Sequence, residues 1–424
     1  MFQEERQKGL IEVCVVYHHL YGKEEDHCLE SGRTAQDWKQ PFITNEHLAA
    51  SDLLWPVSSA SAKSALRRLI GPSHYCKMMQ FQPDNGQSDV PTRRYFSSNH
   101  MTDLFQLLPS SKALHQNFLA LRDSALHRPV RDFMNDIYHR MGDPNGGFLR
   151  NFQGNGFHAR VFELAVYEYL STAGFSVDHS HDQPDFLITK GNETICFEAT
   201  TTNPPDRSDR DISIFGVQPL TGEELFEKIY REFPKRILSS LSKKVRHHYH
   251  KLPQCKGRPL VVAVGPYFEP GSVTMTDDAL VYALYGVGET YGMPISKEPF
   301  FDQPQNRTIS AILYTNQYTV PRFFRLADGA LDQHNVTIFR QGYCMIDVGP
   351  THEYLQYRYQ VGHPSAPIET WGQGVTLFLN QNAMVPIDAE ALPSTSVFSV
   401  KEGGLYRDVR GIHTLTSFMV IHHR

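Results

Sequence analysis

The fold of this chain is decided by a stretch that begins with Ala159-Arg160-Val161-Phe162-Glu163-Leu164-Ala165-Val166-Tyr167 and continues through Pro184-Asp185-Phe186-Leu187-Ile188 to Cys196-Phe197-Glu198-Ala199-Thr200. The first piece has the residue pattern of a helix, and the other two have that of short strands. Three carboxylates, those of Glu163, Asp185 and Glu198, therefore follow one another on a helix, a strand and a second strand.

The elements around these carboxylates predict where the side chains point. We expect a helix over 158–172, strands near 175–178, 185–189 and 194–200, and a hairpin that joins the last two strands through 189–193. The alternation along a strand places Glu198 and Thr200 on one face of the sheet. Asp185 can reach Glu198 across the hairpin, and Glu163 would enter from the helix that covers the sheet.

This combination of carboxylates is typical of a metal site for phosphodiester chemistry. Mg²⁺ or Mn²⁺ is held by carboxylate oxygens, and the remaining positions stay open for water and phosphate. Glu163, Asp185 and Glu198 are the candidate ligands. Single acids on helices and Pro-Asp turns are also common without any function, so the hypothesis depends on the order of the elements.

The order helix, Asp185, Glu198 resembles the PD-(D/E)xK nuclease superfamily, whose fold is that of restriction endonucleases. This resemblance implies an α/β fold with a mixed central sheet flanked by helices, and a magnesium-dependent nuclease with DNA as the expected substrate. Residues from about 140 to 390 are more specifically similar to one uncharacterised bacterial family. That similarity rests on Asp143-Pro144-Asn145-Gly146, Phe162-Glu163-Leu164, Pro184-Asp185-Phe186, Phe197-Glu198-Ala199-Thr200-Thr201-Thr202-Asn203, Lys256-Gly257-Arg258-Pro259-Leu260, Leu284-Tyr285-Gly286, Ile309-Ser310-Ala311-Ile312-Leu313 and Trp371-Gly372-Gln373-Gly374.

Thr200 departs from the superfamily pattern, which has lysine at this position. A lysine would orient the attacking water and place positive charge beside the developing phosphorane. Threonine donates one neutral hydrogen bond and is no base near neutral pH. Lys244 is the candidate replacement, because it lies at the edge of the buried face of a helix predicted by Ile237 and Leu241. An ordinary solvated lysine is the competing interpretation.

A strongly basic segment follows the candidate site. Between Lys228 and Arg258 there are ten lysines and arginines and one acid, Glu232, in a chain whose formal net charge is -5. We expect a basic helix from 235 to 251 that contacts phosphates of a nucleic acid; a helix face that is merely solvated is the alternative. The candidate nucleic-acid contacts are Lys235, Arg236, Lys243, Lys244 and Arg246.

Length and composition indicate how many domains to expect. With 424 residues, of which 40% are hydrophobic, the chain is long enough for two or three domains. We expect a mainly helical N-terminal region of unknown role over 1–140, an α/β core over 141–334, and a strand- and loop-rich region over 335–424. Glu4 and Glu5 stand where a secretion signal has basic residues, which favours a cytoplasmic protein.

Other chemistries find less support in the sequence. Neither a phosphate-binding loop nor a nucleophile elbow is present, and six scattered cysteines form no C-x-x-C pair. Histidine groups at 179–181 and 247–250 lack the spacing of known zinc motifs. Three hypotheses remain. The first is a magnesium-dependent nuclease, the second is a nuclease fold that has lost catalysis at Thr200 and binds nucleic acid or a protein partner, and the third, with the least support, is a different metal hydrolase that uses the histidines.

Overall fold

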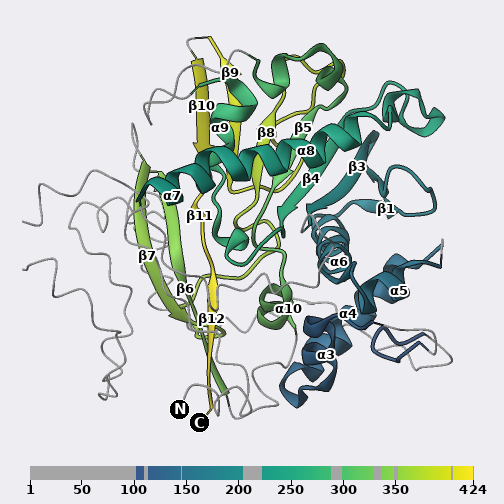
Figure 1. Ribbon diagram of the computed structural model, residues 1–424, viewed down its shortest axis with the longest axis vertical. Coiled ribbons are helices and arrows are strands. Elements are labelled where there is room, and N and C mark those ends of the chain that lie inside the picture. Colours follow the sequence, from purple (N-terminus) through teal and green to yellow (C-terminus); the bar gives the residue numbers. More distant parts are fainter. Residues whose placement is uncertain are drawn as a thin grey trace, which may run out of the picture.

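The computed structural model describes residues 102–108, 113–144, 146–203, 222–287, 298–327, 336–347, 352–402 and 404–423 (Figure 1). Most of the N-terminal region expected to be helical, residues 1–101, lies outside these ranges. The described part of that region forms α3 (Gln116–Asp123) and α4 (Arg128–Met141).

An eight-stranded mixed sheet forms the centre of the molecule, and the expected α/β class is confirmed. The strand order is β1-β2-β3-β4-β5-β8-β9-β10. The pairs β3–β4, β4–β5 and β8–β9 are parallel, and the other four pairs are antiparallel. The strands are β1 (Ser176–Asp178), β2 (Phe186–Lys190), β3 (Glu193–Thr202), β4 (Leu260–Pro266), β5 (Ala311–Tyr314), β8 (Thr376–Leu379), β9 (Ser396–Lys401) and β10 (Gly404–Val409).

Helices cover both faces of this sheet, and alternate residues of each strand pack against one side or the other. Phe197 of β3 belongs to the apolar core beneath α6 (Phe157–Thr172), together with Phe162 of that helix. Cys196, its neighbour in β3, belongs to the opposite core with Ile237 and Leu241. Because side chains alternate along a strand, Glu198 faces the same side as Cys196.

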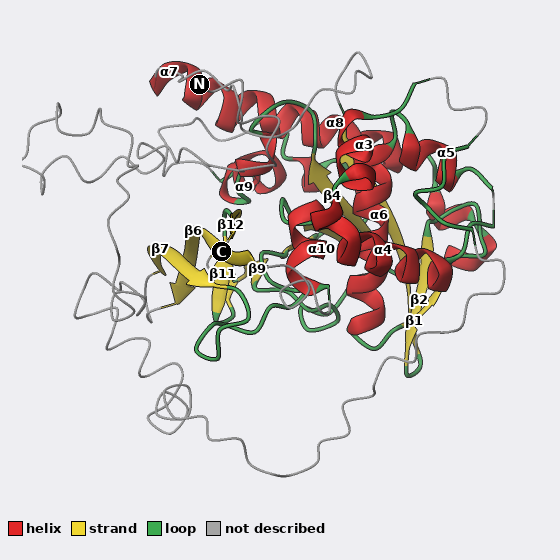
Figure 2. Ribbon diagram, turned by 90° about the horizontal axis from the view of Figure 1, so that it is seen from below, coloured by secondary structure: helices red, strands yellow, loops and turns green. Residues whose placement is uncertain are grey.

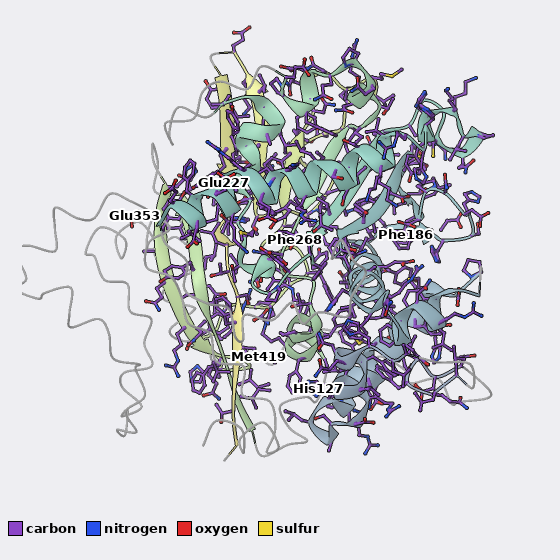
Figure 3. All side chains as sticks on the ribbon, in the orientation of Figure 1. His127, Phe186, Glu227, Phe268, Glu353 and Met419 are labelled. Carbon is purple, nitrogen blue, oxygen red and sulfur yellow. The ribbon has the colours of Figure 1, made fainter. Side chains whose placement is uncertain are left out.

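A long helix crosses the second face. It consists of α7 (Gly222–Glu227), a π-helical turn (Lys228–Glu232) and α8 (Phe233–Val245), with α9 (Asp278–Tyr285) beside α8 (Figure 1). Pro234 lies in the first turn of α8, where its missing N–H costs no hydrogen bond. Phe268, labelled in Figure 3, belongs to the apolar core on this face of the sheet together with Ile237 and Leu241 of α8.

The expected extension of the basic helix to residue 251 is wrong. The helix ends at Val245, and two short 3-10 turns follow over Tyr249–Lys251 and Pro253–Cys255. His248 adopts a left-handed φ of 52°, which is incompatible with continuing the helix. The proline at 253 adds a second barrier, because it has no N–H to donate.

The remaining helices lie on the α6 side of the sheet. Helix α4 packs on α6 and on α10 (Val320–Leu326), while α5 (Phe148–Gln153) packs against α6. Figure 2 shows this group of helices at one end of the molecule and a smaller sheet at the other. None of the helices in the described ranges is long and apolar enough to cross a membrane.

The smaller sheet is built from residues after 335. Its strands are β6 (Val336–Asp347), β7 (His352–Gln360), β11 (Ile412–Thr414) and β12 (Phe418–His423). The strands β7, β11 and β12 each pair with β6 in the antiparallel direction. Figure 3 labels Glu353 on β7 and Met419 on β12. The strands after residue 335 are thus divided between two sheets, because β8, β9 and β10 extend the central sheet.

Candidate functional site

Asp185 and Glu198 lie together on the face of the sheet that α8 covers. Asp185 directly precedes β2, whose first residue, Phe186, pairs with Phe197 of β3. The backbone N–H of Asp185 donates to Glu198 Oε2 over 3.0 Å, and the N–H of Ala199 donates to Asp185 Oδ2 over 2.8 Å. These reciprocal bonds across the hairpin hold both carboxylates in place.

Lys244 reaches this carboxylate pair from the last turn of α8. Its ammonium donates to Glu198 Oε1 in a close ion pair. Burial acts to lower the pKa of Lys244, but the carboxylates of Glu198 and Asp185 outweigh it, so the pKa is raised. Lys244 is therefore a fixed positive charge inside the site rather than a solvated lysine of the basic helix.

Glu163 approaches from α6 and is buried. Its Oε2 accepts an ion-paired hydrogen bond from Arg160, one turn earlier on the same helix. His179 connects the two sides of the site, because its Nδ1 donates to the carbonyl oxygen of Asp185 over 2.6 Å while its Nε2 lies 3.8 Å from Glu163 Oε1. Burial raises the pKa of Glu163, Arg160 and His179 act to lower it, and Glu198 adds to the rise.

The three carboxylates repel one another. Burial, followed by the charges of Glu198 and Glu163, raises the pKa of Asp185 well above its usual value, although Lys244 opposes the rise. Three acids thus face two permanent cations, Lys244 and Arg160. An additional cation at this place would relieve the repulsion.

The donor set is only partly that of a metal centre. Carboxylate oxygens are the ligands that Mg²⁺ and Mn²⁺ prefer. Within the described ranges, however, no three His, Cys, Asp or Glu side chains are arranged to hold a metal ion. Glu198 has both oxygens engaged, and Glu163 is turned to Arg160. Asp185 Oδ1, by contrast, has no hydrogen-bond partner among the described residues.

Thr200 lies two residues beyond Glu198 on the same face of β3, opposite Val264 of β4. It is half-buried, and its hydroxyl bonds to none of the described residues. The threonine thus lies on the face of β3 that carries Glu198, and no described residue holds its hydroxyl in place.

Sequence reasoning missed three participants in this site: Arg160, His179 as a positioning group, and Tyr249. The three-residue spacing of Arg160 and Glu163 on a helix was a usable signal. Tyr249 is buried in the 3-10 turn after α8. Burial, and then the charge of Glu198, raises the pKa of Tyr249, yet its hydroxyl makes no hydrogen bond with a described residue. Nothing in the sequence places it near Glu198.

The five candidate nucleic-acid contacts have different surroundings. Lys235, Lys243 and Arg246 are exposed and form no ion pair with a described residue. Arg236 is half-buried, lies over the ring of Phe268 and is 3.4 Å from Glu232. Lys244 points into the carboxylate site. The exposed cations next to the site are thus Lys243 and Arg246, near the end of α8 that lies beside β3 (Figure 1).

Comparisons with family models, with curated proteins and with solved structures give no match for this chain.

Proposed function

We propose that this protein is a divalent-metal-dependent phosphodiesterase that cleaves nucleic acid, with DNA as the expected substrate and a PD-(D/E)xK-like core. One observation carries the proposal: Lys244 extends from α8 to Glu198, beside Asp185. A lysine next to two carboxylates is the combination that such a site requires, and here it comes from a helix because β3 carries Thr200.

Asp185 and Glu198 would hold the metal, with Glu163 as a third ligand if it exchanges Arg160 for the ion. Mg²⁺ or Mn²⁺ supplies Lewis-acid activation of the phosphate and a more acidic bound water. The raised pKa values of Asp185 and Glu163 support this assignment, because a site with crowded carboxylates gains most from a cation.

The chain's own residues have separate roles in this proposal. Lys244 places positive charge where negative charge develops on the phosphate, which is the largest usual contribution of such a group. The hydroxyl of Thr200, which has no described partner, orients water or a phosphate oxygen. His179 holds the backbone of Asp185 through its carbonyl oxygen and so positions the carboxylate.

Lys243 and Arg246 would hold the nucleic acid next to the cleavage site. Both are exposed, and their positive charges are not neutralised by a described acid. Contacts to phosphate are independent of sequence and weaken with salt, because each one releases a counterion. This part of the proposal therefore makes no claim about base specificity.

The test is cleavage of plasmid, single-stranded DNA and RNA with Mg²⁺ or Mn²⁺ by the parent, Asp185→Ala and Lys244→Ala. We expect cleavage by the parent alone, while Lys244→Ala still binds Mn²⁺ in a calorimetric titration. Cleavage that survives Asp185→Ala would come from a contaminant or another site and would contradict the proposal.

A nucleic-acid-binding module without catalysis is the second candidate. It is favoured by the engagement of both Glu198 oxygens and by the pairing of Glu163 with Arg160. In that case neither metal supports cleavage by the parent, and Glu198→Ala leaves DNA affinity unchanged or higher, because one negative charge near the phosphates is removed.

A further inference from the structure

Three buried arginines surround a single carboxylate between α10 and the smaller sheet. Arg322 and Arg325 come from α10, and Arg340 comes from β6. Their guanidinium nitrogens lie 3.4, 3.3 and 2.9 Å from Glu369, in that order. The side chains of all three arginines are at most 2% exposed. This arginine cluster is remote in sequence from the carboxylate site and takes no part in the proposed cleavage.

Among the residues that the structure describes, the arginine cluster has too few negative charges and hydrogen-bond acceptors. Glu369 is the only acid that forms an ion pair with it among the described residues. Three buried nitrogens make no hydrogen bond with any described residue, namely Arg322 Nε, Arg325 Nε and Arg340 Nη2; Arg325 Nε lies near Glu369 but outside hydrogen-bond geometry. Buried charges are normally paired and hydrogen-bonded, so this arrangement calls for a further acceptor.

The electrostatics of Arg322 and Glu369 agree with this, whereas the pKa of Arg340 is raised, because Tyr357, Glu369 and Tyr359 outweigh the effect of its burial. Burial, followed by the charges of Arg340 and Arg325, lowers the pKa of Arg322 to about 9. The same positive surroundings lower the pKa of Glu369 to about 2 against the effect of its burial. Both shifts have the sign expected where a negative charge is favoured.

A small cavity adjoins Arg340 and has a polar wall. Its volume is about 20 Å³, and Tyr357, Tyr359, Gln373 and Thr414 help to line it. The other polar groups of Arg340 are used: Nε donates to Ser417 Oγ, and Nη1 donates to Tyr359, Glu369 and Gln373. Arg340 lines the cavity, and its Nη2 is the one of its nitrogens that makes no hydrogen bond with a described residue.

The size of the cavity limits what it can hold. About 10–15 Å³ of such space holds one water-sized particle, so a monatomic ion fits and a tetrahedral phosphate does not. A water molecule would satisfy Nη2 but would leave the excess of positive charge unchanged. A halide would satisfy the donor and reduce that charge in one step.

We propose that this cavity binds a single halide ion, chloride under ordinary conditions, through Arg340 Nη2 with the Thr414 hydroxyl at its side. The ion locks α10 and the loop that carries Glu369 against the smaller sheet, because Arg340 links β6 to Glu369. The inference does not depend on the proposed nuclease function.

Diffraction from crystals of the full chain grown in sodium bromide is the direct test, because bromide scatters anomalously. We expect an anomalous peak within hydrogen-bonding distance of Arg340 Nη2. Bromide peaks at exposed sites together with none in this cavity would overturn the proposal. This measurement needs no variant and therefore does not depend on how a variant folds.

Thermal unfolding gives a second test in solution. At constant ionic strength, replacing sodium gluconate by sodium chloride should raise the Tm of the parent by a few degrees with a saturating dependence on chloride. Arg340→Gln should lose this dependence. Arg358→Gln should keep it, because Arg358 is an exposed β7 residue between Tyr357 and Tyr359 and points to the other face. Equal Tm values of the parent in the two salts would contradict the proposal.

Discussion

Lys244 of α8 forms an ion pair with Glu198 of β3, so that a residue from a basic helix neutralises the carboxylate that ends the candidate nuclease motif. The lysine next to it, Lys243, is exposed and forms no ion pair within the described part of the chain. Two adjacent residues of the same type thus have different surroundings, and the consequences of this difference can be measured.

Replacing Lys244 by methionine should destabilise the protein by about 1–3 kcal/mol, because it leaves the buried Glu198 without its cation. Lys243→Met should change the free energy of unfolding by no more than about 0.5 kcal/mol, since that side chain is exposed. Urea unfolding at pH 7 without divalent metal compares the two. Equal losses would mean that the ion pair contributes nothing specific.

Moving the lysine back to β3 should restore catalysis in part. Lys244→Met should lower kcat by about 10²–10³, the usual effect of removing one charge-stabilising donor. Adding Thr200→Lys to that variant should recover part of the loss, because residue 200 lies on the same face as Glu198. Single-turnover cleavage with Mn²⁺ measures both rates. A double variant as slow as Lys244→Met would show that position 200 does not face the reacting phosphate.

Asp185→Asn should make the protein more stable at neutral pH in the absence of metal. The pKa of Asp185 is raised in the fold, so the folded state holds its proton to higher pH than the unfolded chain does. Stability from this group is therefore fully present below the unfolded pKa and is lost as pH rises through the folded pKa. The gain in the free energy of unfolding that Asp185→Asn brings should therefore shrink as the pH falls towards about 4. Chemical unfolding at several pH values tests this, and a gain that grows as pH falls would have the wrong sign.

Glu369→Gln should destabilise the fold by about 3–5 kcal/mol at pH 7, because three buried arginines lose their carboxylate. The pKa of Glu369 is lowered to about 2, so its contribution is present above the unfolded pKa and is lost as pH falls towards 2. The difference between parent and variant should therefore shrink in acid. Glu353→Gln on β7 is the matched control, and an equal loss there would remove the special role of Glu369.

Reversing two exposed charges next to the site should weaken DNA binding. Lys243→Glu with Arg246→Glu should reduce affinity strongly at low salt and flatten its dependence on salt, because fewer counterions are released. The control variant, Arg358→Glu with Lys401→Glu, changes the net charge by the same amount at exposed positions of β7 and β9. It should leave DNA binding nearly unchanged. Fluorescence anisotropy across a salt series measures both. Equal losses would indicate an effect of net charge alone.

Local pattern was sufficient for the elements around the candidate site. The helix predicted over 158–172 is α6, and the strands predicted near 185–189 and 194–200 are β2 and β3. Periodicity reports such elements because burial on one face selects apolar residues at a fixed spacing. It failed at the end of α8, because the predicted helix extends to residue 251, whereas α8 ends at Val245 and His248 has a left-handed backbone.

The sequence by itself determined the α/β class, the order of Glu163, Asp185 and Glu198 on their elements, and the face of β3 that carries Glu198 and Thr200. Only the tertiary structure decided which cation joins them, because Lys244 and Glu198 are 46 residues apart and meet only when α8 packs on β3. The same holds for Arg322, Arg340 and Glu369, whose charges interact strongly only after burial has removed the water that separates them in the unfolded chain.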